Sequence, residues 1–272
     1  MLPPTISSYF AVLLALPAAT LAATLDCENI RIDKQDFNLK GIGGPKTVHF
    51  QEYDPPSISN TTFTIDICNG LQRDDAIDKS KQCPFGTQVC GVEEAYHLTD
   101  GTHFTVKVQP IAGEFTTTHG RNRALDPQWT RLKGGASNED AEREGLRLEL
   151  HGGKYPETKD GKAHKAIIEF LCDAELTGNE GFEDPKAKRL VSRAEGGDGE
   201  GEGDSGDDDV TLPDLDKGKS IKFVSFKNEG EDQTKVLRLN WKTKYACEGA
   251  KAAPPPPKKS SSWGFFTWFL IM

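Results

Sequence analysis

The side chains best suited to chemistry in this chain of 272 residues are its six cysteines. A cysteine thiolate is a nucleophile and a zinc ligand, and two cysteines can form a disulfide. An even count is typical of a disulfide framework in an oxidising compartment, although six cysteines allow many connectivities. We interpret all six as disulfide partners and none as a nucleophile: Cys27, Cys68, Cys83, Cys90, Cys172 and Cys247.

Cys83 and Cys90 flank a Pro-Gly turn, and their short separation favours a local bridge across that loop. Half of a zinc site is the alternative interpretation. The spacing exceeds the roughly two to four intervening residues of a zinc finger, and no second Cys or His pair stands at finger-like spacing. We therefore expect neither a metal nor a cofactor.

The six histidines are scattered along the chain, without the spacing of a metal-binding pair on a helix. The sequence has no Gly-x-Ser-x-Gly elbow, and the glycines of residues 41–44 lack the lysine and the helix of a phosphate loop. We therefore expect that the protein is not an enzyme. The histidines are His49, His97, His103, His119, His151 and His164.

The N-terminal residues 1–23 are typical of a secretory signal peptide, because an apolar run is followed by small residues that suit cleavage. No Lys or Arg precedes the run. A buried N-terminal helix is the alternative, which the helix-breaking Pro17 disfavours. Asn60, Thr61 and Thr62 form the only glycosylation triplet, and after Pro55-Pro56 we place it at a loop edge in the lumen.

The C-terminal residues are typical of a membrane entry. Residues 251–262 are a linker of Pro, Lys and Ser, and residues 263–272 are apolar and open with aromatic side chains. A helix of that length covers about 15 Å, against a hydrocarbon core of about 30 Å. We therefore expect the chain as given to stop inside a transmembrane helix.

Between these ends, short stretches alternate apolar and polar residues with the period of a half-buried strand. Turn clusters separate them, and only residues 139–144 could form a helical turn. The pattern predicts an all-β fold. The stretches are residues 27–37, 47–53, 62–68, 97–110, 145–151, 165–172, 221–226 and 236–247.

Two of these predicted strands, residues 165–172 and 236–247, both end in a cysteine. We interpret them as two strands of one sheet joined by a bridge between Cys172 and Cys247, so that the residues between them form an excursion. In the same way, Cys27 and Cys68 would tie the first strand to the third.

The excursion carries much of the chain's charge. Residues 195–209 hold eight of the acidic residues in a chain of net charge −9. Such a tract buries too little apolar surface to become ordered, so we expect a disordered acidic insertion over about 185–217. Loose calcium binding and processing at Lys188-Arg189 are alternatives to a merely solvated tract. No basic patch indicates nucleic-acid binding.

Three motifs resemble those of the autophagy-related protein 27 family: Phe170-Leu171-Cys172-Asp173, Cys83-Pro84 with Cys90, and Trp-Lys-Thr-Lys-Tyr-Ala-Cys at residues 241–247. The resemblance implies a single-pass type I membrane protein whose lumenal domain, here residues 24–250, belongs to the mannose 6-phosphate receptor homology superfamily. That fold is a flattened β-barrel of two packed sheets. The implied disulfides are Cys27–Cys68, Cys83–Cys90 and Cys172–Cys247.

Sugar-binding members of that superfamily hold mannose with a Gln, an Arg, a Glu and a Tyr. Carried over, Gly91 and Val92 stand where the Gln is expected, His164 where the Arg is expected, and Leu237 at the Tyr position, while the Glu position falls near Glu229. We expect a degenerate sugar site. A protonated His164 could mimic the Arg in an acidic lumen, although without its bidentate fork.

The resemblance implies a trafficking role in autophagy, with movement among Golgi, endosomes, cytoplasmic vesicles, the preautophagosomal structure and the vacuole. Its implied partners are the membrane and the multispanning autophagy protein 9, and its implied processes include cytoplasm-to-vacuole transport. A lumenal lectin or cargo receptor for mannose-bearing glycoproteins is the alternative. A glycan or a phosphoinositide ligand stays open.

Overall fold

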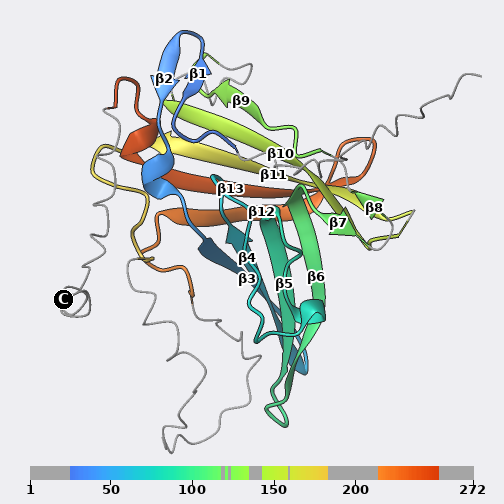
Figure 1. Ribbon diagram of the computed structural model, residues 1–272. Helices are drawn as coiled ribbons and strands as arrows, with labels where there is room; N and C mark the ends of the chain where they lie inside the picture. Colours follow the sequence, from blue (N-terminus) through green and yellow to red (C-terminus); the bar gives the residue numbers. More distant parts are fainter. Residues whose placement is uncertain are drawn as a thin grey trace, which may run out of the picture.

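The structure is a computed structural model that describes residues 25–117, 120–121, 124–134, 143–158, 160–182 and 214–250 (Figure 1). Its regular elements are strands and short 3-10 helical turns, which confirms the all-β prediction. In chain order they are β1 (Ile30–Ile32), β2 (Gln35–Phe37), η1 (Lys40–Ile42), β3 (Lys46–Asp54), β4 (Ser57–Ile65), η2 (Lys79–Lys81), β5 (Thr87–His97), β6 (His103–Gly113), β7 (Thr116–Thr117), β8 (Gly120–Arg121), β9 (Gln128–Arg131), β10 (Gly145–Tyr155), β11 (Lys162–Cys172), β12 (Ile221–Glu229), β13 (Thr234–Thr243) and η4 (Lys244–Ala246).

One large sheet forms the body of the molecule. Its strands follow the order β12, β13, β11, β10, β6, β5, β4 and β3, and β9 pairs with β10. Between β10 and β6 a single pair, Gly152 with Ala112, is in register, and there the sheet folds into two layers whose strands cross in Figure 1. A Cβ at Gly153 would overlap the carbonyl oxygen of Ile111, so this fold line requires glycine.

The two end strands of the sheet, β3 and β12, meet again at a seam that nearly closes the barrel. Across it the rings of Phe50 and Phe223 stack with centroids 4.7 Å apart, and Phe63 packs against Phe223 at 5.8 Å. Side chains rather than a backbone ladder therefore bring the ends of the sheet together. The expected flattened barrel of two packed layers is confirmed.

The predicted neighbours β11 and β13 lie side by side and run parallel. Their inward side chains include Phe170 and Trp241, which face each other across the pair with ring centroids 5.4 Å apart. Trp241 is fully buried, and its indole N–H donates to the carbonyl of Gly178 over 2.8 Å. A buried indole with its polar atom paired anchors the core at this point.

Several predicted strands have shifted boundaries, and two of the predicted stretches contain a turn. Residues 27–37 form a hairpin of β1 and β2, because Asp33 and Lys34 adopt φ of 48° and 69° and turn the chain. The stretch 97–110 begins as a turn, in which the N–H of Gly101 donates to the carbonyl of His97, and strand β6 starts at His103.

The acidic insertion was expected to end near residue 217, but its last part is ordered. Asp216 is 7% exposed and lies against β3. Residues 185–213 of that insertion lie outside the described residues, as do residues 1–23, His119, residues 139–142, Lys188-Arg189, and residues 251–262 and 263–272. In the part of the chain that the structure describes, no helix is long and apolar enough to cross a membrane.

Candidate functional site

All six cysteines are paired, and the pairs are those that the resemblance implies. Cα–Cα distances are 5.5 Å for Cys27–Cys68, 6.1 Å for Cys83–Cys90 and 4.5 Å for Cys172–Cys247. The last bridge joins the end of β11 to Cys247, which follows the 3-10 turn η4 rather than ending β13 as predicted; β13 stops at Thr243, the register partner of Cys172. No thiol is left to act as a nucleophile or as a thiolate ligand.

Glu144 lies beside the Cys172–Cys247 bridge. These three side chains bring their ligand atoms within 4.8 Å of one another, the one such group among the described residues. The bonded sulfurs cannot serve as thiolates, so the group does not suit zinc. Instead the Glu144 carboxylate accepts a hydrogen bond from the N–H of Glu248, and its carbonyl accepts one from the N–H of Cys172 at 3.0 Å. Glu144 therefore fastens the bridged strand ends.

His164, at the expected arginine position, is buried in the barrel interior. It is 3% exposed, and its ring lies 6.3 Å from that of Tyr155 and 5.8 Å from that of Phe226. Burial, and then the charge of Lys235, lowers the pKa of His164 to about 4. A hydrogen bond to the backbone of Pro110 raises the pKa but does not offset these two effects. Burial therefore favours the neutral imidazole over the protonated form that could mimic an arginine.

Val92 lies on the face of its strand that points away from the barrel interior. Its neighbour Gly91 pairs with Phe63, and a Cβ at Gly91 would lie 3.0 Å from the Phe63 ring, which is fully buried in the core. Successive residues of a strand point to opposite faces. Gly91 therefore faces inward without a side chain, and Val92 cannot contribute to an interior site.

Leu237, at the expected tyrosine position, is fully buried core. In register it lies between Ala166 of β11 and Phe226 of β12. It has no polar atom with which to hold a sugar hydroxyl. The three positions predicted as a degenerate site are thus a buried neutral ring, an outward valine and a core leucine, and they do not form a common binding surface.

The fourth position, Glu229, is engaged elsewhere. Its carboxylate accepts two hydrogen bonds from the guanidinium of Arg238, at 2.8 Å and 2.7 Å. Because Leu237 and Leu239 point inward, Arg238 between them points to the outer face of the sheet. The hydrogen bond raises the pKa of Arg238 and lowers the pKa of Glu229. The sequence did not predict this ion pair, because predicting it requires the register between β12 and β13.

The interior near His164 presents cations and rings. The ammonium of Lys235 lies 4.2 Å from the ring centroid of Phe226, and Lys107 pairs with Glu93 at 2.7 Å. Burial, and then repulsion by Lys107, lowers the pKa of Lys235. This arrangement lacks, among the described residues, the bidentate fork with which an arginine holds a sugar.

Asn60 does not lie at a loop edge as expected. It stands inside β4, paired with Gln51 of β3 and Glu94 of β5, and is 8% exposed. The two prolines before it make the turn, and the strand resumes at Ser57. Its glycosylation stays a prediction.

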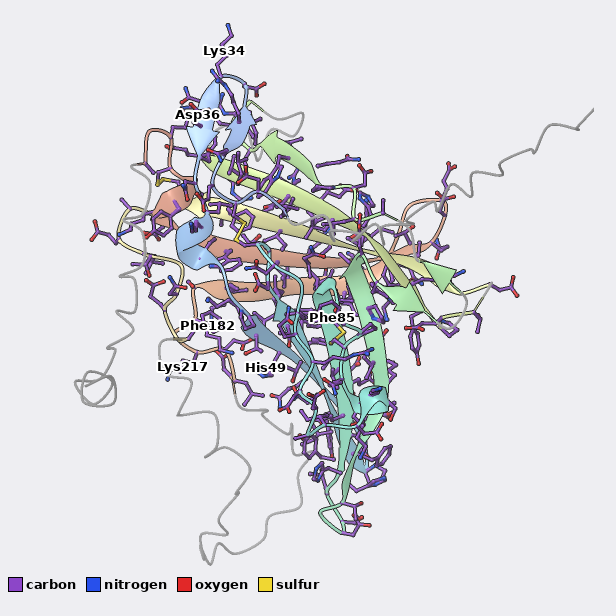
Figure 2. All side chains as sticks on the ribbon, in the orientation of Figure 1. Lys34, Asp36, His49, Phe85, Phe182 and Lys217 are labelled. Atoms are coloured by element: carbon purple, nitrogen blue, oxygen red, sulfur yellow. A yellow bond between two sulfur atoms is a disulfide. The ribbon has the colours of Figure 1, made fainter. Side chains whose placement is uncertain are left out.

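Sequence reasoning also missed the polar cluster at the seam, which the labels of His49, Phe182 and Lys217 mark in Figure 2. The N–H of His49 donates to the Asp216 carboxylate at 2.7 Å, and Lys219 donates to the same carboxylate at 2.8 Å. The Lys219 ammonium also lies 5.2 Å from the ring centroid of Phe182. These groups hold the segment before β12 against β3.

Comparison with known proteins decides the family. The family described as Autophagy-related protein 27 matches residues 10–272. The chain belongs to the Autophagy-related protein 27 family. A relative of that name from Arthroderma benhamiae is 37% identical over 263 residues, which cover 96% of this chain and 79% of the relative. Another from Gibberella zeae is 36% identical over 292 residues, which cover 100% and 82%. A third from Yarrowia lipolytica is 34% identical over 74 residues, which cover 27% of this chain and 26% of the relative.

Membership of the Autophagy-related protein 27 family links the chain to autophagy and agrees with the resemblance of its cysteine motifs. The barrel has three disulfides, and the carried-over positions Gly91, His164 and Leu237 offer no charged or bidentate group, although Lys235 lies in the interior beside Phe226.

Proposed function

We propose that the chain is a non-catalytic trafficking component of autophagy. In this role it is a single-pass membrane protein of the Golgi, endosomes, cytoplasmic vesicles, preautophagosomal structure and vacuole. It supports the cycling of autophagy protein 9, cytoplasm-to-vacuole transport and vesicle formation. The observation that carries the proposal is the match to the Autophagy-related protein 27 family over residues 10–272.

The barrel interior supports trafficking over the lectin alternative. A mannose site needs donors and acceptors arranged around the sugar hydroxyls, and positions without them contribute little to binding a sugar. Here the position of the tyrosine is core leucine, Leu237, and the position of the arginine is a neutral histidine, His164.

A glycan array probed with the full chain at neutral and acidic pH separates the two functions. We expect no signal on high-mannose or phosphomannose glycans above that on unrelated glycans of the same array. Saturable mannose binding would support the lectin.

The trafficking role is tested in cells from which the chain has been removed. We expect tagged autophagy protein 9 to change its distribution among Golgi, vesicles and vacuole, and re-expression of the chain to restore it. An unchanged distribution in the absence of the chain would contradict the proposal.

A further inference from the structure

One end strand of the sheet, β3, is half covered along its free edge. The Nζ of Lys219 donates to the carbonyl of Thr47 at 2.9 Å, and the N–H of His49 donates to Asp216 at 2.7 Å. Both backbone groups therefore point away from β4. In a strand, the N–H and C=O of every second residue point to the same side. Gln51 and Tyr53 consequently present their backbone groups to the same free edge.

That part of the edge is open. Among the residues that the structure describes, no hydrogen bond to the backbone of Gln51 or Tyr53 comes from outside the β3–β4 ladder. Natural sheets usually cover or blunt such an edge, because unpaired N–H and C=O groups are a template for an added strand. The cluster of Asp216 and Lys219 covers β3 only as far as His49.

The side chains beside the open edge differ between its two faces. Glu52 and Asp54 point to one face and both are exposed. Tyr53 points to the other face, is 40% exposed, and has the apolar Ile58 directly opposite it on β4. An added strand would therefore meet two carboxylates on one face and an apolar surface on the other.

From this geometry we propose that the edge of β3 from Gln51 to Asp54 binds an extended segment of a partner protein as an added strand. The segment carries basic side chains on the face of Glu52 and Asp54, and apolar side chains on the face of Tyr53. Backbone hydrogen bonds supply affinity, and the alternating side chains supply selectivity, as in other cases of strand addition. The inference rests on the edge alone and is independent of the trafficking role.

A second copy of the chain is a poorer occupant. Antiparallel pairing of β3 with its own copy, centred on residue 52, sets Glu52 opposite Glu52, and centring it on residue 53 sets Glu52 opposite Asp54. Like charges directly opposite each other destabilise a strand pair. Basic residues at alternate positions of a different chain remove this repulsion.

The probe for this site is a fluorescein-labelled peptide of eight residues that alternates lysine and valine, titrated with the full chain and followed by fluorescence anisotropy. We expect saturable binding that weakens as salt is added, because the carboxylates and ammonium groups are exposed. The same peptide N-methylated at its valines, which lie opposite Gln51 and Tyr53 in the antiparallel register, cannot donate to the edge of β3, and we expect it not to bind. Equal binding of the methylated peptide, or no binding of either peptide, would overturn the proposal.

The matching variant of the chain is Gln51→Pro. The N–H that proline removes points to the open edge and not to β4, so the sheet tolerates the substitution. We expect peptide affinity to fall about tenfold, because one hydrogen bond is lost and the edge is altered. Val224→Pro, at the exposed bulge of the other end strand β12, is the control and should bind as the unmodified chain does. Unchanged affinity in Gln51→Pro would overturn the proposal.

If Gln51→Pro destabilises the fold and lowers the melting temperature, a second variant that reverses two surface charges still tests the proposal. The double variant Glu52→Lys with Asp54→Lys alters exposed side chains only. It should lose the lysine–valine peptide and gain a glutamate–valine peptide, and unchanged preference would count against the site. If light scattering shows that the chain dimerises and that Gln51→Pro abolishes the dimer, the occupant is a second copy and the assignment of a partner protein is wrong.

Discussion

His49 and Asp216, which lie 167 positions apart in the sequence, meet through two hydrogen bonds at the barrel seam. The N–H of His49 donates to one carboxylate oxygen at 2.7 Å, and Nδ1 of the same residue lies 2.8 Å from the other. Asp216 therefore joins the end of the acidic insertion, just before β12, to β3. Charged acceptors of this kind make stronger hydrogen bonds than neutral ones.

Replacing Asp216 should loosen the seam. We expect Asp216→Ala to lower the free energy of unfolding by about 1 to 3 kcal/mol, because His49 and Lys219 lose a buried charged acceptor. Urea denaturation measures the change. Asp232→Asn, an exposed position, is the control and should stay within about 0.5 kcal/mol of the unmodified chain.

The same carboxylate should make stability fall in acid. Burial raises its pKa, but the hydrogen bonds from His49 and Lys219 outweigh burial and hold the pKa of Asp216 below its usual value of 3.8. The stabilisation is therefore present above pH 3.8 and is lost as the pH falls through the lowered pKa. Comparing urea midpoints of the unmodified chain and Asp216→Asn from pH 5 to pH 2 checks this. An acid limb of equal steepness in both would refute it.

His164 should make the fold less stable between neutral and acidic pH. Its pKa is about 4 in the folded chain and 6.5 in the unfolded one, so the unfolded state binds the proton first. The contribution is complete above pH 6.5 and is lost progressively down to pH 4. Between pH 7 and pH 5 the free energy of unfolding should fall by about 2 kcal/mol from this residue. His164→Phe should flatten that slope, and an NMR titration in which the His164 ring titrates near pH 6.5 would contradict the account.

Two of the three disulfides, Cys172–Cys247 and Cys83–Cys90, should differ in how much stability their removal costs. Cys172–Cys247 closes a separation of 75 residues, and Cys83–Cys90 closes one of 7. In the loop-entropy description, the longer loop contributes about 4 to 5 kcal/mol and the shorter one less. Serine pairs at each bridge, compared by urea denaturation, should rank in that order. A larger loss at Cys83–Cys90 would show that local geometry outweighs loop length.

Shortening Trp241 should cost more stability than shortening Trp129. Trp241→Phe removes the donor to the Gly178 carbonyl and leaves space in the core, so we expect a loss of about 2 to 3 kcal/mol. Trp129→Phe is the matched control, since Trp129 is only partly buried on β9. Equal losses at the two positions would mean that the indole hydrogen bond contributes little.

The sequence predicted those parts of the fold that depend on local patterns. Alternation around Trp241 marked β13, and the pairing of Cys172 with Cys247 pointed to the neighbouring β11, although Cys247 lies beyond β13, after the turn η4. Features set by distant contacts were missed. Asp216 looks like the end of a solvated tract, and only its approach to His49 gives it a partner.

The sequence also does not predict which face of a strand points into the barrel. Moving by one residue exchanges inside and outside, so the choice between Gly91 and Val92 depends on the register with Phe63. Asn60 is similar, because its neighbouring prolines suggested a loop although both adjoining strands pair with it. The lowered pKa of His164 likewise follows from its burial between two aromatic rings, and the spacing of residues in the sequence does not predict that contact.

The most direct test of the trafficking role is the rate of autophagic delivery to the vacuole in cells whose only copy of the chain ends at Ser262. Trafficking by a membrane protein requires its anchor, because a lumenal domain alone cannot engage cytosolic sorting coats. We predict that this shortened chain is made and folded but that delivery falls to the level of cells lacking the chain. Delivery at the normal level would place the activity wholly in the lumenal domain and contradict the account.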